Sequence, residues 1–114
     1  MAFHIYCIDD PAKSDLRLET RPEHLRYMIA HKDRILFGGP IKNEPDGPTV
    51  GSAFALGYET RAEVDSFLEN EPYFLAGLFE SVVVRFIAIM VPEHNPGFLE
   101  KELEREVRKA PPVR

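Results

Sequence analysis

Residues 79–91 read FESVVVRFIAIMV and form the longest apolar stretch that the sequence presents as a β-strand. β-branched and aromatic residues dominate this stretch, which is typical of strands. Successive side chains of a strand point to opposite faces, so apolar residues would lie on both faces here. Such a strand needs cover on both sides. The stretch therefore predicts a strand that lies inside a layered structure.

Five further elements are predicted before this strand. Residues 60–63, with the sequence TRAE, form a capping box that opens a helix, and NEPY at 70–73 breaks it. Val64, Phe67 and Leu68 give that helix its apolar face. Hydrophobic patterning predicts the other elements: strands at 2–8, 34–41 and 52–58, a helix at 14–32, a loop at 42–51, and a further helical turn within 73–78.

The element order is therefore β-α-β-β-α-β, the ferredoxin-like pattern of an α+β domain. Its antiparallel sheet carries two helices on one face and leaves the other face bare. Because the last strand is apolar on both sides, we expect the bare face to pack on a second subunit. The fold class predicts a homodimer.

The helix at 14–32 contains Pro22, which permits two interpretations. Either one helix is kinked near Pro22, or a short turn at 14–19 precedes a helix that starts near Thr20 and is capped by it. In both versions Leu25, Met28 and Ile29 follow the i, i+3, i+4 rule and predict a buried stripe.

Residues 92–114 depart from this pattern and are predicted to be a C-terminal extension of the domain at 1–91. Prolines bracket the stretch FLEKELEREVRK, whose charges and apolar residues partly support a helix. We expect an appended helix that docks on the barrel or on a neighbouring subunit. A frayed tail is the alternative.

Composition excludes several classes of function. A chain of 114 residues with a net charge of −5 lacks the basic excess of a nucleic-acid binder. No stretch reaches the length of apolar residues that a membrane span requires, and the N-terminus does not read as a secretory signal. The single cysteine, Cys7, cannot form an intrachain disulfide, so we expect a cytoplasmic protein. Cys7 itself reads as a core residue of the first strand.

His24, in the stretch RPEHLRYM at 21–28, is the first candidate site residue. Helical spacing places it beside the predicted apolar stripe, on a flank shared with Arg17, Arg21, Met28 and His31. A histidine at the edge of a buried face can act as a general acid or base. The alternative is a boundary histidine that bonds a backbone carbonyl.

Glu71 and Arg85 are the next candidates. The proline after Glu71 should hold this carboxylate in an extended conformation, from which it could orient an imidazole or take a proton itself. Arg85 lies among apolar residues and would need a counter-charge, such as Glu71, a partner subunit or an anionic ligand. The alternatives are a solvated turn carboxylate and a snorkelling arginine.

The stretch Gly38-Gly39-Pro40 is predicted to be a turn at the end of the second strand, where glycines would allow a ligand to approach the backbone. An ordinary turn is the alternative. The spacing of the four histidines matches no metal-binding motif, so no metal site is expected.

The sequence resembles the YCII-related (YciI-like) proteins of the dimeric α+β barrel superfamily. Three stretches carry the resemblance, which covers about residues 2–91: LRLETRPEHLRY at 16–27, ILFGGPI at 35–41 and NEPYFLAGLFESVVVRF at 70–86. It implies a pocket in which His24 and Glu71 act as an acid/base pair. The family usually has aspartate where this chain has Glu71, and glutamate is one methylene longer.

The resemblance implies cofactor-independent proton transfer on a small oxygenated molecule, of the lyase, isomerase or dehydrochlorinase kind. His24 would move the proton and Glu71 would orient its ring. Arg21 or Arg85 would hold an anionic group of the ligand. Tyr27, Gly39, Pro40 and Tyr73 would shape the wall. The alternatives are a module of the same fold that binds a small ligand or another protein without catalysis, and a heme or metal protein.

Overall fold

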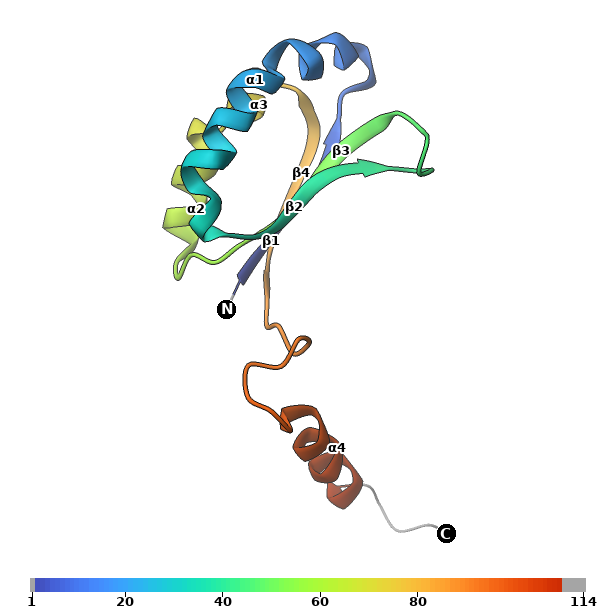
Figure 1. The fold of residues 1–114 in the computed structure, drawn as a ribbon, viewed down its shortest axis with the longest axis vertical. Coiled ribbons are helices and arrows are strands. Elements are labelled where there is room, and N and C mark those ends of the chain that lie inside the picture. The colour runs from blue at the N-terminus through green and yellow to red at the C-terminus, as the bar shows by residue number, and fades with distance from the viewer. Residues whose placement is uncertain (1, 110–114) are drawn as a thin grey trace.

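The computed structural model describes residues 2–109, which form one four-stranded antiparallel sheet with helices on one face (Figure 1). The strands lie in the order β2-β3-β1-β4. The predicted β-α-β-β-α-β order is confirmed, with bounds as follows: β1 Ala2–Asp9, α1 Ser14–His31, β2 Ile35–Lys42, β3 Thr49–Leu56, α2 Arg61–Asn70, α3 Pro72–Leu75, β4 Phe79–Ile87 and α4 Phe98–Lys109. Short 3₁₀ turns at Pro11–Lys13 and Lys32–Arg34 flank α1.

The core lies between the central strands and α2. Ile5 of β1 pairs with Phe54 of β3 and Val84 of β4, and all three point toward the helices. Val64, Phe67 and Leu68 of α2 are buried against this layer, as the sequence predicts. Cys7 is fully buried in the same cluster. Apolar burial of this kind supplies most of the driving force for folding.

The capping box of α2 is confirmed. The Thr60 hydroxyl accepts a hydrogen bond from the backbone N–H of Glu63, and the Glu63 carboxylate accepts one from the backbone N–H of Thr60. These contacts satisfy two donors that the first turn of a helix leaves unpaired. The start of α2 is thereby fixed by local sequence.

α1 is one helix with Pro22 inside it, so the version that begins near Thr20 is wrong. Proline removes the N–H that would bond the carbonyl of Leu18, four residues earlier. Leu18 is exposed, so water can satisfy that carbonyl. The cost of an internal proline is reduced where the freed group stays hydrated.

The predicted buried stripe of α1 is wrong for two of its three residues. Leu25 is 40% exposed and Ile29 is 65% exposed, whereas Met28 packs partly against the core. No residue of α1 is fully buried. Leu25 lines a cavity between α1 and the sheet, described below, and therefore has no packing partner on that side. Ile29 does not line this cavity and faces solvent.

Gly38, Gly39 and Pro40 lie within β2 and do not form the predicted turn. Proline cannot donate a hydrogen bond to a sheet, but β2 is an edge strand with one unpaired side. The strand therefore tolerates Pro40. The connection between β2 and β3 is shorter than the predicted loop, because β2 extends to Lys42 and β3 begins at Thr49. At the other end of the fold, β4 ends at Ile87, four residues before the predicted end.

The face of the sheet opposite the helices is apolar and uncovered in the single chain. Tyr6 of β1 pairs with Val83 of β4, and their side chains are 41% and 39% exposed. Phe37 and Ile87 are exposed as well. We call these four residues the open sheet face. An exposed apolar patch of this kind usually marks an interface.

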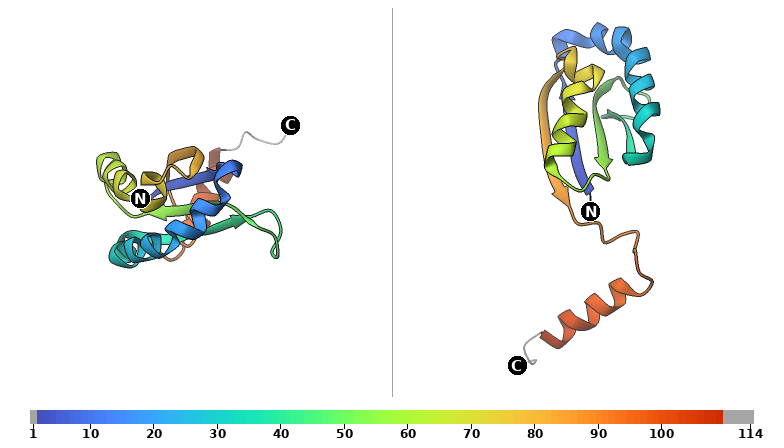
Figure 2. Two further views of the ribbon diagram at one scale, coloured as in Figure 1. Left: turned by 90° about the horizontal axis from the view of Figure 1, so that it is seen from above. Right: turned by 90° about the vertical axis from the view of Figure 1, so that its left-hand side faces the viewer.

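α4 is a helix, as predicted, but it lies apart from the sheet and helices of its own chain (Figures 1 and 2). The expectation that it docks on its own barrel is therefore wrong, and docking on a neighbouring subunit stays a prediction. Leu103 and Val107 remain exposed along it. The last part of the predicted extension, 110–114, falls outside the described residues. No helix within residues 2–109 has the length and apolar character to cross a bilayer.

Candidate active site

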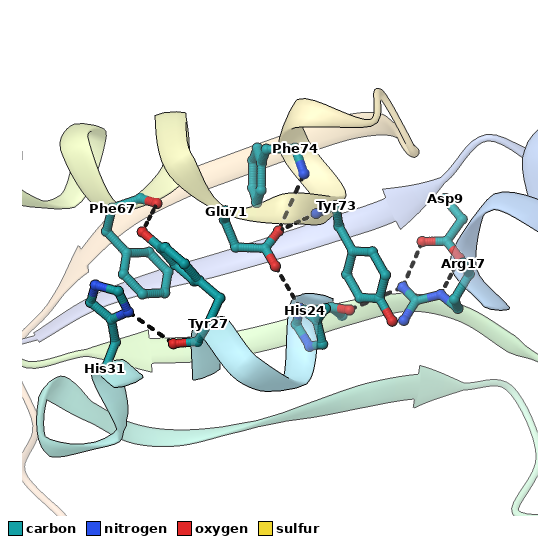
Figure 3. Close-up of polar contacts among 10 residues, drawn as sticks. Asp9, Arg17, His24, Tyr27, His31, Phe67, Glu71, Tyr73 and Phe74 are labelled. Carbon is teal, nitrogen blue, oxygen red and sulfur yellow. Dashed lines mark hydrogen bonds and ion pairs between the residues drawn. The ribbon is translucent and has the colours of Figure 1, made fainter. Parts of the chain in front are cut away.

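His24 and Glu71 form a direct hydrogen-bonded pair between α1 and the α2–α3 junction (Figure 3). The Nδ1 atom of His24 lies 2.5 Å from Oε1 of Glu71. The Glu71 side chain is 2% exposed and the His24 side chain is 19% exposed. Forty-seven residues separate the two groups in sequence, so only the tertiary fold brings them together.

The backbone at Pro72 fixes the Glu71 carboxylate. Glu71 adopts the extended conformation predicted for a residue before proline, with φ −72° and ψ 128°. Its Oε2 accepts hydrogen bonds from the backbone N–H groups of Tyr73 at 2.9 Å and Phe74 at 3.2 Å. Glu71 is thus the N-cap of α3, which leaves Oε1 for His24.

The same arrangement fixes the tautomer of His24. A carboxylate only accepts hydrogen bonds, so the proton of the His24–Glu71 bond belongs to Nδ1. The imidazole also stacks on Tyr73, with ring centroids 4.0 Å apart and planes 17° from parallel. The ring is held in position and orientation, and Nε2 of the neutral form carries a free lone pair.

A second polar cluster supports the other side of Tyr73. The Arg17 guanidinium lies 4.8 Å from the Tyr73 ring centroid and binds both carboxylate oxygens of Asp9, at 2.7 and 2.8 Å. Arg17 also donates to the Ser52 hydroxyl at 3.0 Å. Burial opposes the charge of Arg17, but the hydrogen bond and ion pair with Asp9 outweigh it and raise the pKa. Arg17 therefore stays charged.

A cavity of about 620 Å³ opens beside this pair, between α1 and the β2–β3 side of the sheet. Five of the predicted site residues line it: Arg21, His24, Gly39, Pro40 and Tyr73. Sequence reasoning missed other lining residues, namely Lys32, Lys42, Thr49, Ser52 and Phe54. Lys42 and Thr49 fell in a predicted loop, where no periodicity indicates which side chains face inward.

Tyr27 does not line this cavity, contrary to the prediction. Three residues after His24, it points from another side of α1, and its hydroxyl donates to the Phe67 carbonyl at 2.7 Å. It faces a smaller cavity of about 350 Å³ together with His31, which was predicted to share the flank of His24. Burial raises the pKa of Tyr27 to about 12, with smaller contributions from Tyr58 and Glu71.

Arg85 is also absent from the cavity. It is exposed on β4 and pairs in register with His4, on the open sheet face. Strand alternation explains this position, because the neighbouring Val84 points into the core. In the single chain the guanidinium is exposed to water and needs no buried counter-charge.

Two more titratable groups lie near the pair. Burial raises the pKa of the Tyr73 phenol, and Arg17 partly opposes this effect. Burial likewise raises the pKa of the Cys7 thiol to about 12, and the carboxylates of Glu71 and Asp9 add to the shift. Both groups therefore stay protonated near neutral pH. Within residues 2–109, no three side chains of the metal-binding types gather closely enough to hold an ion.

The family model of the YCII-related domain matches residues 1–88. The chain belongs to the YCII-related family. It is 30% identical over 92 residues to protein YciI of Escherichia coli O6:H1 and, equally, to protein YciI of Shigella flexneri, covering 75% of this chain and 94% of each relative. The sequence-based assignment is thereby confirmed.

The fold is similar to a solved structure of the same class. 5-Chloro-2-hydroxyhydroquinone dehydrochlorinase (TftG) from Burkholderia phenoliruptrix matches with a TM-score of 0.72 and 34% identity, over 77% of this chain and 94% of the other. TftG was solved in complex with 2,5-dihydroxybenzoquinone. The dimeric α+β barrel fold predicted from sequence is confirmed for this YCII-related chain.

Proposed function

We propose that this YCII-related protein catalyses a cofactor-independent proton transfer on a small organic ligand bound in the 620 Å³ cavity. The observation that carries the proposal is the His24–Glu71 pair, in which the imidazole of His24 lines the cavity and Glu71 lies behind it. The size of the cavity suits a ligand of one ring or a short chain.

In the proposed reaction, His24 is the catalytic residue and Glu71 is a positioning residue. Nε2 of His24 takes a proton from a carbon of the ligand, and the electron pair of that C–H bond moves into the ligand. The imidazolium that forms is stabilised by the Glu71 carboxylate at Nδ1. The proton then returns to another ligand atom in an isomerisation, or leaves with the departing group in an elimination.

The similarity to TftG supports this proposal. That protein is a dehydrochlorinase crystallised with a quinone of one ring, and loss of HCl from a ring requires removal of a proton. Fold alone does not determine a reaction, so the proposal also needs His24, which is bonded to Glu71 and lines the cavity.

We further propose that the protein acts as a homodimer in the cytoplasm. The open sheet face, with Tyr6, Phe37, Val83 and Ile87 exposed, would be covered by a second copy. The single, fully buried cysteine suits a reducing compartment.

Deuterium exchange tests the proposed chemistry with 2,5-dihydroxybenzoquinone as the probe. Loss of its ring C–H signal in D₂O is followed by NMR with the wild type, His24→Gln and a control, His94→Gln, whose histidine does not line the cavity. We expect the wild type and the control to accelerate exchange by about 100-fold or more over buffer, and His24→Gln to lose this effect.

Two other results would contradict proton transfer at this site. If His24→Gln exchanges as fast as the wild type, the pair is not the catalytic group. If the wild type binds the probe but does not accelerate exchange, the protein is better explained as a ligand-binding module.

A further inference from the structure

The cavity is positively charged in a negatively charged protein. The chain carries 14 Lys and Arg against 19 Asp and Glu. The lining of the cavity nevertheless contains Arg17, Arg21, Lys32 and Lys42, and no acidic residue of the described chain. A concave surface of one sign focuses the electrostatic potential and concentrates ligands of opposite charge.

Only one of these four cations is neutralised by a partner. Arg17 is bound by Asp9. Within residues 2–109, no ion pair involves Arg21, Lys32 or Lys42. Most other exposed arginines of the helices are paired with glutamate or aspartate on their own helix. The cavity thus presents three cations that are available to a ligand.

The three available cations lie at different points along the cavity. The hydrogen bond from Arg17 to Ser52 places the N-terminal half of α1 over the strand position where Ser52 pairs with Pro40. α1 and β2 run in opposite directions, so Lys42, two residues beyond Pro40, lies from this point toward the start of α1. Arg21, one helical turn beyond Arg17, lies from this point toward His24. Lys32 is at the opposite end from Lys42, where α1 leads toward β2.

Apart from Lys32, the end of the cavity near the start of β2 is apolar. Leu25, Met28, Ile35 and Phe54 line it. His24 lies between Arg21 and this apolar part along α1, three residues after Arg21 and four before Met28. Along α1 the cavity wall therefore presents a cation, the acid/base group and then apolar side chains.

From this order we infer that the substrate is a small organic carboxylate, with its anionic group held by Arg21 and its apolar body against Met28 and Phe54. Lys32 and Lys42 add to the positive potential of the cavity. The inference rests on the proposed function in placing the ligand in this cavity. Arg21 and His24 are about 4.5 Å apart along the helix axis. The carboxylate therefore lies only a few bonds from the carbon whose proton His24 would move. Arg21 becomes a specificity-determining residue.

Binding of matched acid and amide pairs tests this inference. The probes are benzoate with benzamide and trans-cinnamate with cinnamamide, titrated by calorimetry into the full chain at low salt. We expect at least one acid to bind about tenfold or more tightly than its amide, because the cations add charge-assisted hydrogen bonds. The difference should shrink at high salt.

Charge variants connect this preference to the cavity cations. Arg21→Gln should weaken binding of the acid by about tenfold and Lys42→Gln should weaken it less, and both should leave binding of the amide unchanged. Lys101→Gln, on α4, removes the same charge away from the cavity and should bind both probes as the wild type does. Both target residues are exposed, so these variants are expected to fold.

The inference is overturned if neither acid binds, if acid and amide bind equally, or if Lys101→Gln weakens the acid as much as Arg21→Gln does. The proposed function fails separately. If His24→Gln retains deuterium exchange, the catalytic role of His24 is refuted, but the preference for acids can still hold. Loss of the preference with intact, His24-dependent exchange refutes the substrate class alone.

Discussion

Replacement of the buried carboxylate in Glu71→Ala should destabilise the protein strongly. Three N–H donors, those of Tyr73, Phe74 and His24 Nδ1, point at this carboxylate. An unsatisfied buried donor costs about 1–3 kcal/mol, and His24 is partly accessible to water, so we take values near the lower end. The free energy of unfolding should therefore fall by about 3–5 kcal/mol.

Urea denaturation measures this loss, with Glu69→Ala as the matched control. Glu69 is exposed near the end of the same helix, so its removal should change the free energy of unfolding by less than about 0.5 kcal/mol. If Glu71→Ala costs less than about 1 kcal/mol, the three hydrogen bonds do not hold the junction together and the reasoning is refuted.

Glu71→Gln separates the geometry of the pair from its charge. The amide oxygen can still accept from the backbone of Tyr73 and Phe74, which turns the amide NH₂ toward His24. His24 must then accept at Nδ1 and carry its proton on Nε2, where a base needs a lone pair. ¹⁵N NMR shifts of the imidazole at high pH should show this change of tautomer, and deuterium exchange should fall by about 100-fold or more. An unchanged tautomer would contradict the assigned roles.

Three further predictions concern the core, the second cavity and the open sheet face. Cys7 should resist thiol reagents in the folded protein and react with them in urea. Burial raises the pKa of its thiol to about 12, so the unfolded chain loses this proton at a lower pH than the folded protein does. The free energy of unfolding should therefore fall as the pH rises from about 9 to 12. Labelling of native Cys7 as fast as that of the unfolded chain would contradict its burial. Tyr27→Phe removes the hydrogen bond to the Phe67 carbonyl and should lower the free energy of unfolding by about 1 kcal/mol, measured by denaturation. Binding of the probe should not change. Weaker binding would show that Tyr27 contributes to the ligand site. Val83→Lys should shift the protein from dimer to monomer in light scattering, whereas Leu103→Lys on α4 should not. If both variants remain dimeric, the interface does not lie on the open sheet face.

Local sequence determined the order of the elements and several of their boundaries. The capping box at Thr60 fixes the start of α2, because both partners lie within four residues. Pro72 fixes the extended backbone of Glu71 for the same reason: the constraint acts between neighbours. The place of Cys7 in an apolar strand likewise indicated a core position, and Cys7 is fully buried. The candidate pair itself was named from motifs at 21–24 and 70–73, although no local rule places the two side chains in contact.

Tertiary structure decided the position of several side chains whose local sequence pattern predicts a different place. Leu25 follows the helical pattern of a buried stripe, yet it remains exposed because it lines a cavity. Pro40 reads as a turn residue, yet it lies in a strand because that strand is at the edge of the sheet. Arg85 reads as buried, yet strand alternation places it on the sheet face opposite the helices, where it is exposed in the single chain. The contact of His24 with Glu71 and the gathering of Arg21 and Lys42 around one cavity depend on distances between segments far apart in sequence. Propensity and periodicity act over a few residues, so only the folded chain determines such contacts.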